Sequence, residues 1–415
     1  MTATSSSPIS YSPEPQSLEC ASVPVLALGG GLTLIGVMRS LGPAGMPFYT
    51  VCEDHDFVMR SRWYHPPPAQ PDGGPEGLAD FLHWLPFDQA VLMPCTDEWL
   101  RAVSRLPKAL ARQFPSSIGA ASVIETMTDK WHFAQLLEST GVPHPETLLF
   151  ESYDEMAAVA PHNLQNKILK PLFSATFARK HGVKGYFVQG KADALRVAVA
   201  LDYPILLQDY IPGPPTANVF IDGFVDRNGR VCARFARRRL RMCPPRLGNS
   251  SFLTSIACRE VEPAVKTLDK LLAATAYRGI FSAEFKYDMR DGKFKILEIN
   301  ARPWWYVEFA SHCGVNVCSM AYRDALELPV EVASEYTLGR KCVLLPYDFR
   351  AFRNHDDDSL SLWSWIHSWI GAHGGLFSWT DPLPAITYGW RIVAGFVKHH
   401  FIQSENAGVL REASP

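Results

Sequence analysis

The sequence predicts a mixed fold with an α/β part followed by α+β parts, and three features lead to this prediction. A strand, a glycine turn, a helix and a second strand follow one another between Val23 and Cys52, which is the pattern of a βαβ unit. Short apolar strands and a long hairpin lie between residues 167 and 304, and a tryptophan-rich segment begins at about residue 338. A chain of 415 residues is also long enough for two to four packed units.

The composition is that of an ordinary globular protein, with 47% hydrophobic and 20% charged residues. A net charge of −2 argues against a general nucleic-acid binder. The nine cysteines are scattered and odd in number, which favours reduced thiols in the cytoplasm over disulfides or structural zinc. Residues 1–22 are rich in Ser and Pro and are expected to form a disordered leader, and no apolar run predicts a transmembrane span.

The N-terminal βαβ unit begins with a strand at Val23–Leu28 and a turn at Gly29–Gly31. An acid pair, Glu53–Asp54, follows the second strand, so a dinucleotide site is one alternative, with the acid on a ribose. The dinucleotide fingerprint fails at its third glycine, where the chain has Leu34. A plain α/β domain is therefore favoured, and alternating elements extend it to about residue 118.

The next elements are a helix and a series of strands. Thr128 is the expected helix cap, Phe133, Leu136 and Leu137 form the apolar stripe, and Gly141 ends the helix. Strands are predicted at Lys167–Lys170, Tyr186–Val188, Ile205–Gln208, Val219–Val225 and Val231–Phe235, followed by a helix at Glu262–Ala276. Two aromatic helices, Ser359–His373 and Ile386–Phe401, are expected to cover a sheet; lying on a membrane interface is the alternative.

The segment from Gly279 to Trp304 predicts a hairpin with an Asp291–Gly292 turn. If the hairpin is symmetric about Asp291, Glu284 lies opposite Glu298, and Asn300 shares the face of Glu298. Facing carboxylates repel each other, and a divalent cation would remove the repulsion. Two acids and an amide suit Mg²⁺, which also takes oxygens from phosphates. A surface hairpin whose acids face water is the alternative.

Three other segments carry groups suited to anions or purines. Lys170 ends a strand before a loop of small residues, where a cation and backbone N–H groups can bind a phosphate. Gln208–Gly213 ends a strand and turns, and could present backbone groups to a purine edge. Arg234–Arg246 holds six arginines, of which Arg237, Arg239 and Arg241 alternate and would share a face to bind carboxylate or phosphate. A solvated basic strand is the alternative.

Together these segments resemble the ATP-grasp superfamily of carboxylate–amine ligases over about residues 23–319. The resemblance is most specific at four places: Asp129–Lys130, Ile168–Pro171, Leu207–Gly213, and Glu284 with Glu298–Pro303. The motifs Ser61–Trp63 and Asp381–Pro382 are similar to a branch with D-aspartate ligase-like and carbamoyl-phosphate-synthase-like members.

The resemblance implies a role for each matching residue. ATP phosphates would contact Lys130 and Lys170, and adenine would contact Gln208 and the backbone of Tyr210 and Ile211. Mg²⁺, or Mn²⁺ as an alternative, would bind Glu284, Glu298 and Asn300. Arg302, Arg239 and Arg241 would act on the substrate carboxylate and the transferring phosphate. The chain departs from the family where an acid normally holds the ribose: it reads Pro214 to Asn218 there, and Asp222 is a poor substitute.

The resemblance also implies the domain organisation. An N-terminal Rossmann-like pre-ATP-grasp domain would cover residues 23–118 and the two ATP-grasp lobes residues 119–206 and 207–337, followed by an extension at 338–415. The expected activity is ATP-dependent amide-bond formation between a small carboxylic acid and an amine, with amino acids or a small peptide as substrates. A thiol or hydroxyl acceptor, a nicotinamide-dependent oxidoreductase and a membrane-surface binding protein are alternatives. The oligomeric state stays open, with a homodimer as one expectation.

Overall fold

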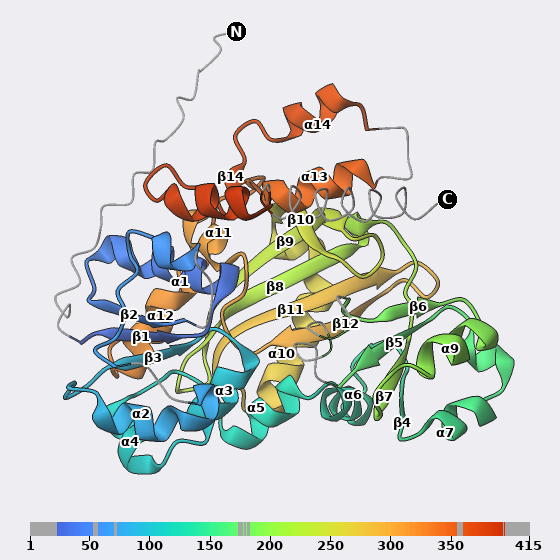
Figure 1. The fold of residues 1–415 in the computed structure, drawn as a ribbon, viewed down its shortest axis with the longest axis horizontal. Coiled ribbons are helices and arrows are strands. Elements are labelled where there is room, and N and C mark those ends of the chain that lie inside the picture. Colours follow the sequence, from blue (N-terminus) through green and yellow to red (C-terminus); the bar gives the residue numbers. More distant parts are fainter. Residues whose placement is uncertain are drawn as a thin grey trace, which may run out of the picture.

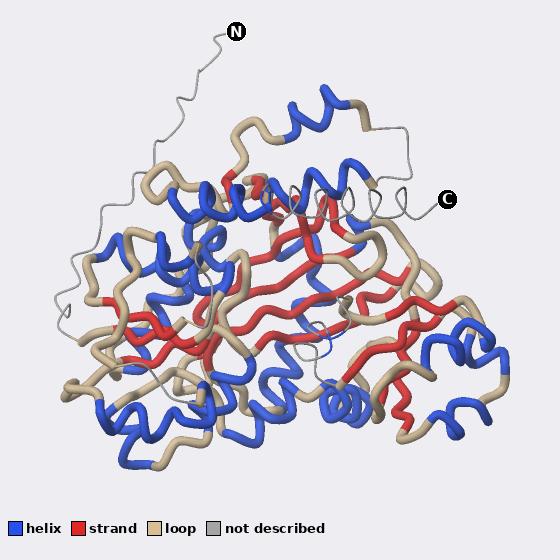
Figure 2. The backbone as a smooth tube through the Cα atoms, in the orientation of Figure 1, coloured by secondary structure: helices blue, strands red, loops and turns tan. Residues whose placement is uncertain are grey.

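The computed structural model describes residues 23–52, 57–69, 73–172, 177, 180, 183–354, 360–392 and 394. Its strands form three sheets, of three, four and seven strands. In Figure 1 the seven-stranded sheet crosses the centre of the molecule, with the three-stranded sheet on its left and the four-stranded sheet on its right. Figure 2 shows helices along the outside of all three sheets. Short 3₁₀ helices lie at Gly42–Ala44, Val58–Arg60, Gly74–Gly77, Pro161–Leu164, Pro215–Ala217 and Cys258–Val261.

The N-terminal sheet is parallel, with the order β2-β1-β3. Its strands are β1 (Val25–Leu28), β2 (Phe48–Val51) and β3 (Val91–Pro94), and its helices are α1 (Gly31–Leu41), α2 (Leu78–Trp84), α3 (Asp97–Ser104) and α4 (Lys108–Gln113). The predicted βαβ unit is confirmed, because α1 connects two parallel strands. Gly29 has a φ of +132°, and a side chain there would come within 2.9 Å of Thr96, so the turn before α1 requires glycine. Glu53–Asp54 lie outside the described residues.

The four-stranded sheet is antiparallel, with the order β4-β7-β5-β6. Its elements and the helices around it are β4 (Thr147–Phe150), β5 (Lys167–Pro171), β6 (Tyr186–Val188), β7 (Ile205–Asp209), α5 (Ala121–Thr128), α6 (Lys130–Ser139), α7 (Tyr153–Ala158) and α9 (Lys191–Ala198). The expected cap of α6 is wrong. Thr128 ends α5, and Asp129 caps α6 by accepting from the N–H groups of Trp131 and His132 at 2.8 and 2.9 Å, as an N-cap aspartate does.

The seven-stranded sheet has the order β12-β11-β8-β9-β10-β13-β14. Its elements and neighbouring helices are β8 (Asn218–Val225), β9 (Val231–Cys243), β10 (Asn249–Ile256), β11 (Gly279–Asp288), β12 (Lys293–Asn300), β13 (Lys341–Val343), β14 (His373–Gly374), α10 (Glu262–Ala274), α11 (Val307–His312) and α12 (Val317–Ala325). The prediction that β9 ends at Phe235 is wrong, because β9 continues to Cys243 through the arginine-rich segment. The sequence also did not predict β4 or β10.

One hydrophobic core joins the N-terminal sheet to the seven-stranded sheet. Helix α1 packs against α11, and the two approach closely at Gly36, where an added Cβ would lie 2.8 Å from Val307. The same core contains Phe235 of β9, whose ring contacts that of Phe309 edge to face at 5.7 Å. The parallel sheet and the hairpin sheet are therefore held in a fixed relation by apolar packing.

The C-terminal extension continues the large sheet. Strand β13 pairs with β10, and β14 pairs with β13; helix α13 (Leu345–Arg353) packs on β9 and β10. The first predicted aromatic helix is shorter than expected, since α14 covers only Leu362–Ser368, and a second helix covers residues 383–392. The part of this second helix expected beyond residue 394 lies outside the described residues. No helix in the described ranges is both long and apolar enough to span a bilayer.

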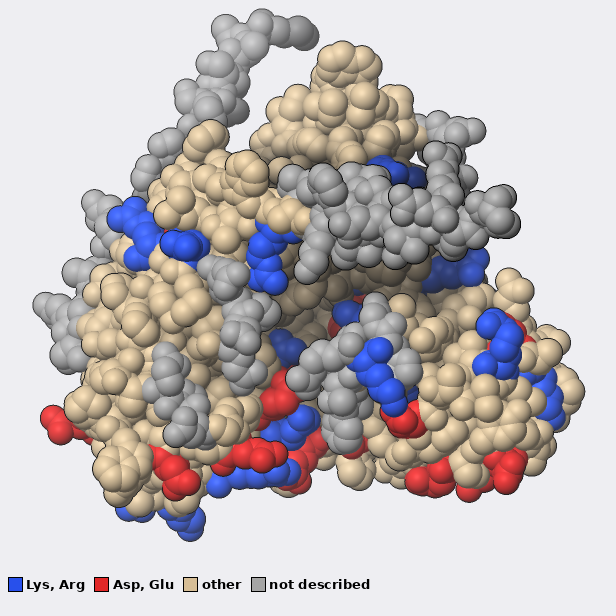
Figure 3. Space-filling view, viewed as in Figure 1, with Lys and Arg blue, Asp and Glu red and all other residues tan. Residues whose placement is uncertain are grey.

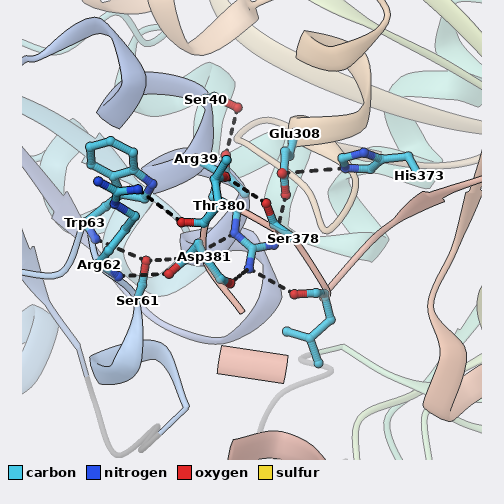
Figure 4. Close-up of polar contacts among 12 residues, drawn as sticks. Arg39, Ser40, Ser61, Arg62, Trp63, Glu308, His373, Ser378, Thr380 and Asp381 are labelled. Atoms are coloured by element: carbon cyan, nitrogen blue, oxygen red, sulfur yellow. Dashed lines mark hydrogen bonds and ion pairs between the residues drawn. The ribbon is translucent and has the colours of Figure 1, made fainter. Parts of the chain in front are cut away.

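A buried polar network fastens the extension to the N-terminal domain (Figure 4). The carboxylate of Asp381 accepts from Arg39 at 3.0 Å, from the Ser61 hydroxyl at 2.8 Å and from the backbone N–H of Arg62 at 2.8 Å. Arg39 also donates to the Asp381 carbonyl and forms an ion pair with Glu308 of α11 at 3.3 Å. Both Arg39 and Asp381 are buried. The Ser61–Trp63 and Asp381–Pro382 motifs, 320 residues apart between Ser61 and Asp381, thus meet at one place.

We expect Asp381→Ala to lower the free energy of unfolding by about 3–5 kcal/mol, because buried Arg39 would lose one of its two counter-charges and the Ser61 hydroxyl and the Arg62 N–H would lose their acceptor. Urea unfolding measures this loss. Arg105→Ala, which breaks the exposed Arg105–Glu125 pair, is the matched control and should cost at most about 1 kcal/mol. Equal losses for the two variants would contradict a structural role for the buried network.

Candidate active site

The centre of the candidate site is the β11–β12 hairpin, where Glu284 pairs directly with Glu298 as predicted. The reason differs from the prediction. Next to the turn, Asp288 pairs with Lys293, so a regular hairpin would place Leu297 opposite Glu284. A bulge between Glu284 and Phe285 shifts the register by one residue and brings Glu298 into position, as β-bulges next to active sites commonly do.

The three predicted metal ligands lie on neighbouring positions of this hairpin. Asn300 pairs with Ser282 and follows Glu298 by two residues, so the two side chains share a face. The Oε1 atom of Glu284 accepts from Asn218 at 2.7 Å and pairs with Arg239 at 3.0 Å. Within the described residues, Oε2 of Glu284 and the carboxylate of Glu298 have no hydrogen-bond or ion-pair partner. Carboxylate oxygens left free beside an amide suit Mg²⁺, so these residues fit the ion.

The two predicted phosphate lysines face the hairpin from the four-stranded side. Lys130 begins α6 and donates to the carbonyls of Pro171 and Leu172 at 2.9 and 3.1 Å, while Lys170 of β5 donates to Gln208 at 2.7 Å. Burial, and next the charge of Lys170, lowers the pKa of Lys130 to about 8, with Glu298 opposing the change. Burial also lowers the pKa of Lys170, against the opposing charges of Glu298 and Glu284. The lysines and the acids are therefore within electrostatic range of one another.

The segment after β7 has its backbone partly engaged. The side chain of Gln208 bridges Lys170 and Thr147, and the N–H of Tyr210 donates to the carbonyl of Asn166 at 3.1 Å. The prediction that the Tyr210 backbone contacts adenine therefore applies at most to its carbonyl. Ile211 is buried at 3% exposure. Its side chain is therefore an apolar part of the site's lining, as expected for a residue that would lie under a purine ring.

The alternating arginines of β9 each meet a carboxylate of their own, and a register irregularity separates Arg239 from Arg241. Arg237 donates to Asp222 at 2.7 Å, Arg239 lies 3.0 Å from Glu284, and Arg241 makes two bonds of 2.9 and 2.7 Å to Asp348. Asp222 is fully buried against Arg237, which removes it as a ribose ligand. Arg239 is at the candidate metal site, whereas the predicted catalytic role of Arg241 conflicts with its pairing to α13.

Arg302 follows the end of β12 and binds the N-terminal end of α3. Its Nε donates to Asp97 at 2.7 Å and its Nη1 to the Pro303 carbonyl at 3.0 Å. Glu308, the acid that follows Arg302 most closely in the sequence, pairs with Arg39 instead. Arg302 thus links the end of the β11–β12 hairpin to α3 beside the parallel sheet; its predicted role toward a substrate carboxylate stays a prediction.

Four residues of the site were not predicted: Asn218, Asp97, Thr147 and Lys286. Lys286 follows Glu284 by two residues on β11, so strand alternation alone could have placed it beside the acid. Burial, and next the charge of Arg239, lowers the pKa of Lys286 to about 8, and Glu284 and Asp288 oppose the change. The other three could not be found, because their partners lie far away in the sequence. Figure 3 shows the surface hollowed at the centre of this face, with charged side chains of both signs around the hollow.

The chain is similar in sequence to two curated proteins. The chain is 22% identical over 249 residues to a D-aspartate ligase of Enterococcus faecium, covering 56% of this chain and 58% of that protein. It is 22% identical over 334 residues to the carbamoyl phosphate synthase large chain of Pyrococcus furiosus, covering 75% and 30%. The chain thus spans between about a third and three fifths of these relatives. No family model matches the chain.

Solved structures are similar over most of the chain. An L-amino acid ligase from Bacillus licheniformis superposes with a TM-score of 0.59 at 15% identity, covering 77% of this chain and 79% of that one. A carboxyaminoimidazole ribonucleotide synthase from Aspergillus clavatus, solved with ATP, gives a TM-score of 0.61 at 16% identity, covering 77% and 81%.

The fold and the paired acids define the class: the chain has the fold of the ATP-grasp ligases. The resemblance read from the sequence is thereby confirmed, and its curated relatives include carboxylate–amine ligases.

The two facing acids should contribute differently to stability in metal-free protein. We expect Glu284→Gln to lower the free energy of unfolding by about 2–3 kcal/mol, because buried Arg239 loses its counter-charge. Glu298→Gln should change it by about 1 kcal/mol or less, because this exposed carboxylate makes no hydrogen bond or ion pair among the described residues and attracts Lys130 and Lys170 only at longer range. Urea unfolding in the presence of EDTA compares them. A loss of similar size for Glu298→Gln would show that its carboxylate has a structural partner.

Proposed function

We propose that this chain is an ATP-dependent carboxylate–amine ligase that uses Mg²⁺. The observation that carries the proposal is the approach of two partly buried lysines, Lys130 and Lys170, to the facing acids Glu284 and Glu298. Cations beside a pair of acids with free oxygens suit a metal-bound nucleotide triphosphate. The sequence similarity to a D-aspartate ligase and the fold similarity to an L-amino acid ligase support the same reaction class.

In the proposed reaction, an oxygen of the substrate carboxylate attacks the γ-phosphorus of ATP, the bond to the bridging oxygen breaks, and ADP leaves. The amine nitrogen then attacks the acyl carbon, phosphate leaves, and the nitrogen loses a proton as the amide forms. Lys130 and Lys170 would hold the phosphates, and Arg239 and Arg302 would neutralise charge on the transferring phosphate and the carboxylate. Bound Mg²⁺ would neutralise phosphate charge and would be held by Glu284, Glu298 and Asn300.

We propose the domain boundaries given above, with residues 23–118 as a Rossmann-like pre-ATP-grasp domain. Its three parallel strands in the order β2-β1-β3 support this assignment. We propose amino acids or a small peptide as the substrates, since two relatives are described as D-aspartate and α-L-glutamate ligases. The cysteines among the described residues are free thiols, which supports the proposed cytoplasmic location.

The function is tested by screening amino acids in pairs for ADP release. With an active pair, Glu298→Gln should lower ADP release by about 100-fold, because one metal ligand loses its charge. Glu331→Gln changes an exposed glutamate and serves as the control. Near-normal ADP release by Glu298→Gln at ordinary Mg²⁺ would overturn the metal site, and the absence of ADP release with every pair would count against the ligase activity.

Arg302→Lys tests the carboxylate site. Lysine keeps the charge and can still pair with Asp97, but it loses the planar fork that binds a carboxylate through two bonds. We expect almost unchanged ATP binding by calorimetry and a fall in kcat of about 100-fold with both substrates saturating. Full activity of this variant would mean that Arg302 serves only to pair with Asp97.

A further inference from the structure

Lys286 is a charged residue of the candidate site to which the proposed reaction gives no role. It lies on β11, two residues beyond Glu284 and on the same face, and its side chain is only 7% exposed. Its ammonium lies 5.1 Å from the centre of the Tyr210 ring, and its Cε lies beside Gly213. The side chain therefore points from the β11–β12 hairpin toward the segment Gln208–Gly213.

The acids that flank Lys286 on its own strand are already neutralised by other groups. Glu284 pairs with Arg239 and accepts from Asn218. Asp288 pairs with Arg290 at 2.7 Å and with Lys295 at 2.8 Å. In the described part of the chain, the Lys286 ammonium makes no hydrogen bond or ion pair; it contacts the Tyr210 ring and feels Glu284 and Asp288 only at longer range.

A buried ammonium without an acceptor is unfavourable, because burial removes its hydration and nothing replaces it. A cation–π contact with one tyrosine compensates only part of that loss. Replacing the lysine by an apolar residue would therefore stabilise the ligand-free protein. The presence of the lysine is best explained by a ligand that brings a hydrogen-bond acceptor for its ammonium. Its position at Gly213 limits that ligand to one bound along Gln208–Gly213.

We propose that Lys286 binds the ribose of the nucleotide by donating hydrogen bonds to its hydroxyl oxygens. This inference rests on the proposed function, in which Gln208–Gly213 holds the purine. Beyond Gly213 the segment Pro214–Asn218 contains no acid to accept from the ribose hydroxyls, and Asp222 is buried against Arg237. A ribose hydroxyl can accept as well as donate, so a lysine beside Gly213 holds the sugar where an acid is lacking.

Calorimetry with ADP and 2′,3′-dideoxy-ADP in the presence of Mg²⁺ tests the proposal. Wild type should bind ADP about tenfold or more tightly than dideoxy-ADP, and Lys286→Met should weaken ADP binding by a similar factor. The variant should bind both nucleotides equally, because the missing hydroxyls and the missing ammonium belong to one interaction. Lys293→Met, which changes an exposed lysine of the same hairpin, should leave the affinity for ADP unchanged within about twofold.

Equal binding of the two nucleotides by wild type would overturn the proposal without any variant. So would a Lys286→Met variant that still prefers ADP to dideoxy-ADP. A wild-type protein that binds neither nucleotide would overturn the proposed function itself, a result distinct from the other two. The melting temperature of ligand-free Lys286→Met should be at or above that of wild type, because a buried unpaired charge has been removed; a clear fall would show that a partner in the free protein holds the ammonium.

Discussion

The facing of Glu284 and Glu298 across the β11–β12 hairpin is the constraint around which the rest of the site is arranged. Two carboxylates at paired positions repel each other, so cations must surround them. Arg239 of β9 pairs with Glu284, and Lys130 of α6 and Lys170 of β5 lie within electrostatic range of the acids. The lysines are themselves disfavoured by burial. The attraction between the acids and the lysines thus offsets part of the repulsion between the acids and part of the cost of burying the lysines. A bound metal would offset the charge of the acids, and a polyphosphate would offset that of the lysines.

Buried ion pairs fix how the parts of the chain meet. Arg241 and Asp348 join β9 to α13, and Arg39 and Asp381 join α1 to the segment after β14. Such pairs contribute little net stability compared with apolar packing, but a mispaired arrangement would leave a charge buried alone. Because Asp348 also accepts from Trp365 and Trp369, the tryptophans predicted to cover a sheet are anchored through one carboxylate. The charges therefore select one arrangement of a mostly apolar interface.

The sequence predicted what depends on local pattern. Strand alternation and a turn dipeptide placed Glu284 opposite Glu298, and helix periodicity located α6 and α10. It failed where long-range geometry decides. The bulge at Leu297 of β12 has no local signature, so the right pairing was predicted from a wrong register at the turn. The partner of Arg241 lies 107 residues away, and no spacing rule connects it to Asp348. Likewise, the length of β9 depends on acids that other elements bring to its arginines.

The ion pairs of the arginine-rich segment also limit which of its arginines could bind an anionic substrate. Of the arginines between Arg234 and Arg246, all but Arg246 lie within ion-pair distance of a carboxylate among the described residues. Arg246 is exposed and lies over the ring of Phe187 at 4.7 Å, where the four-stranded sheet approaches the loop between β9 and β10. Because a paired guanidinium has less capacity for a new anion, Arg246 is the arginine of this series that keeps the most capacity for an incoming carboxylate or phosphate among the described residues. The arginines of β9 thus pair with carboxylates of the sheet and its neighbours, and the arginine of this series without such a pair among the described residues lies in the loop after β9.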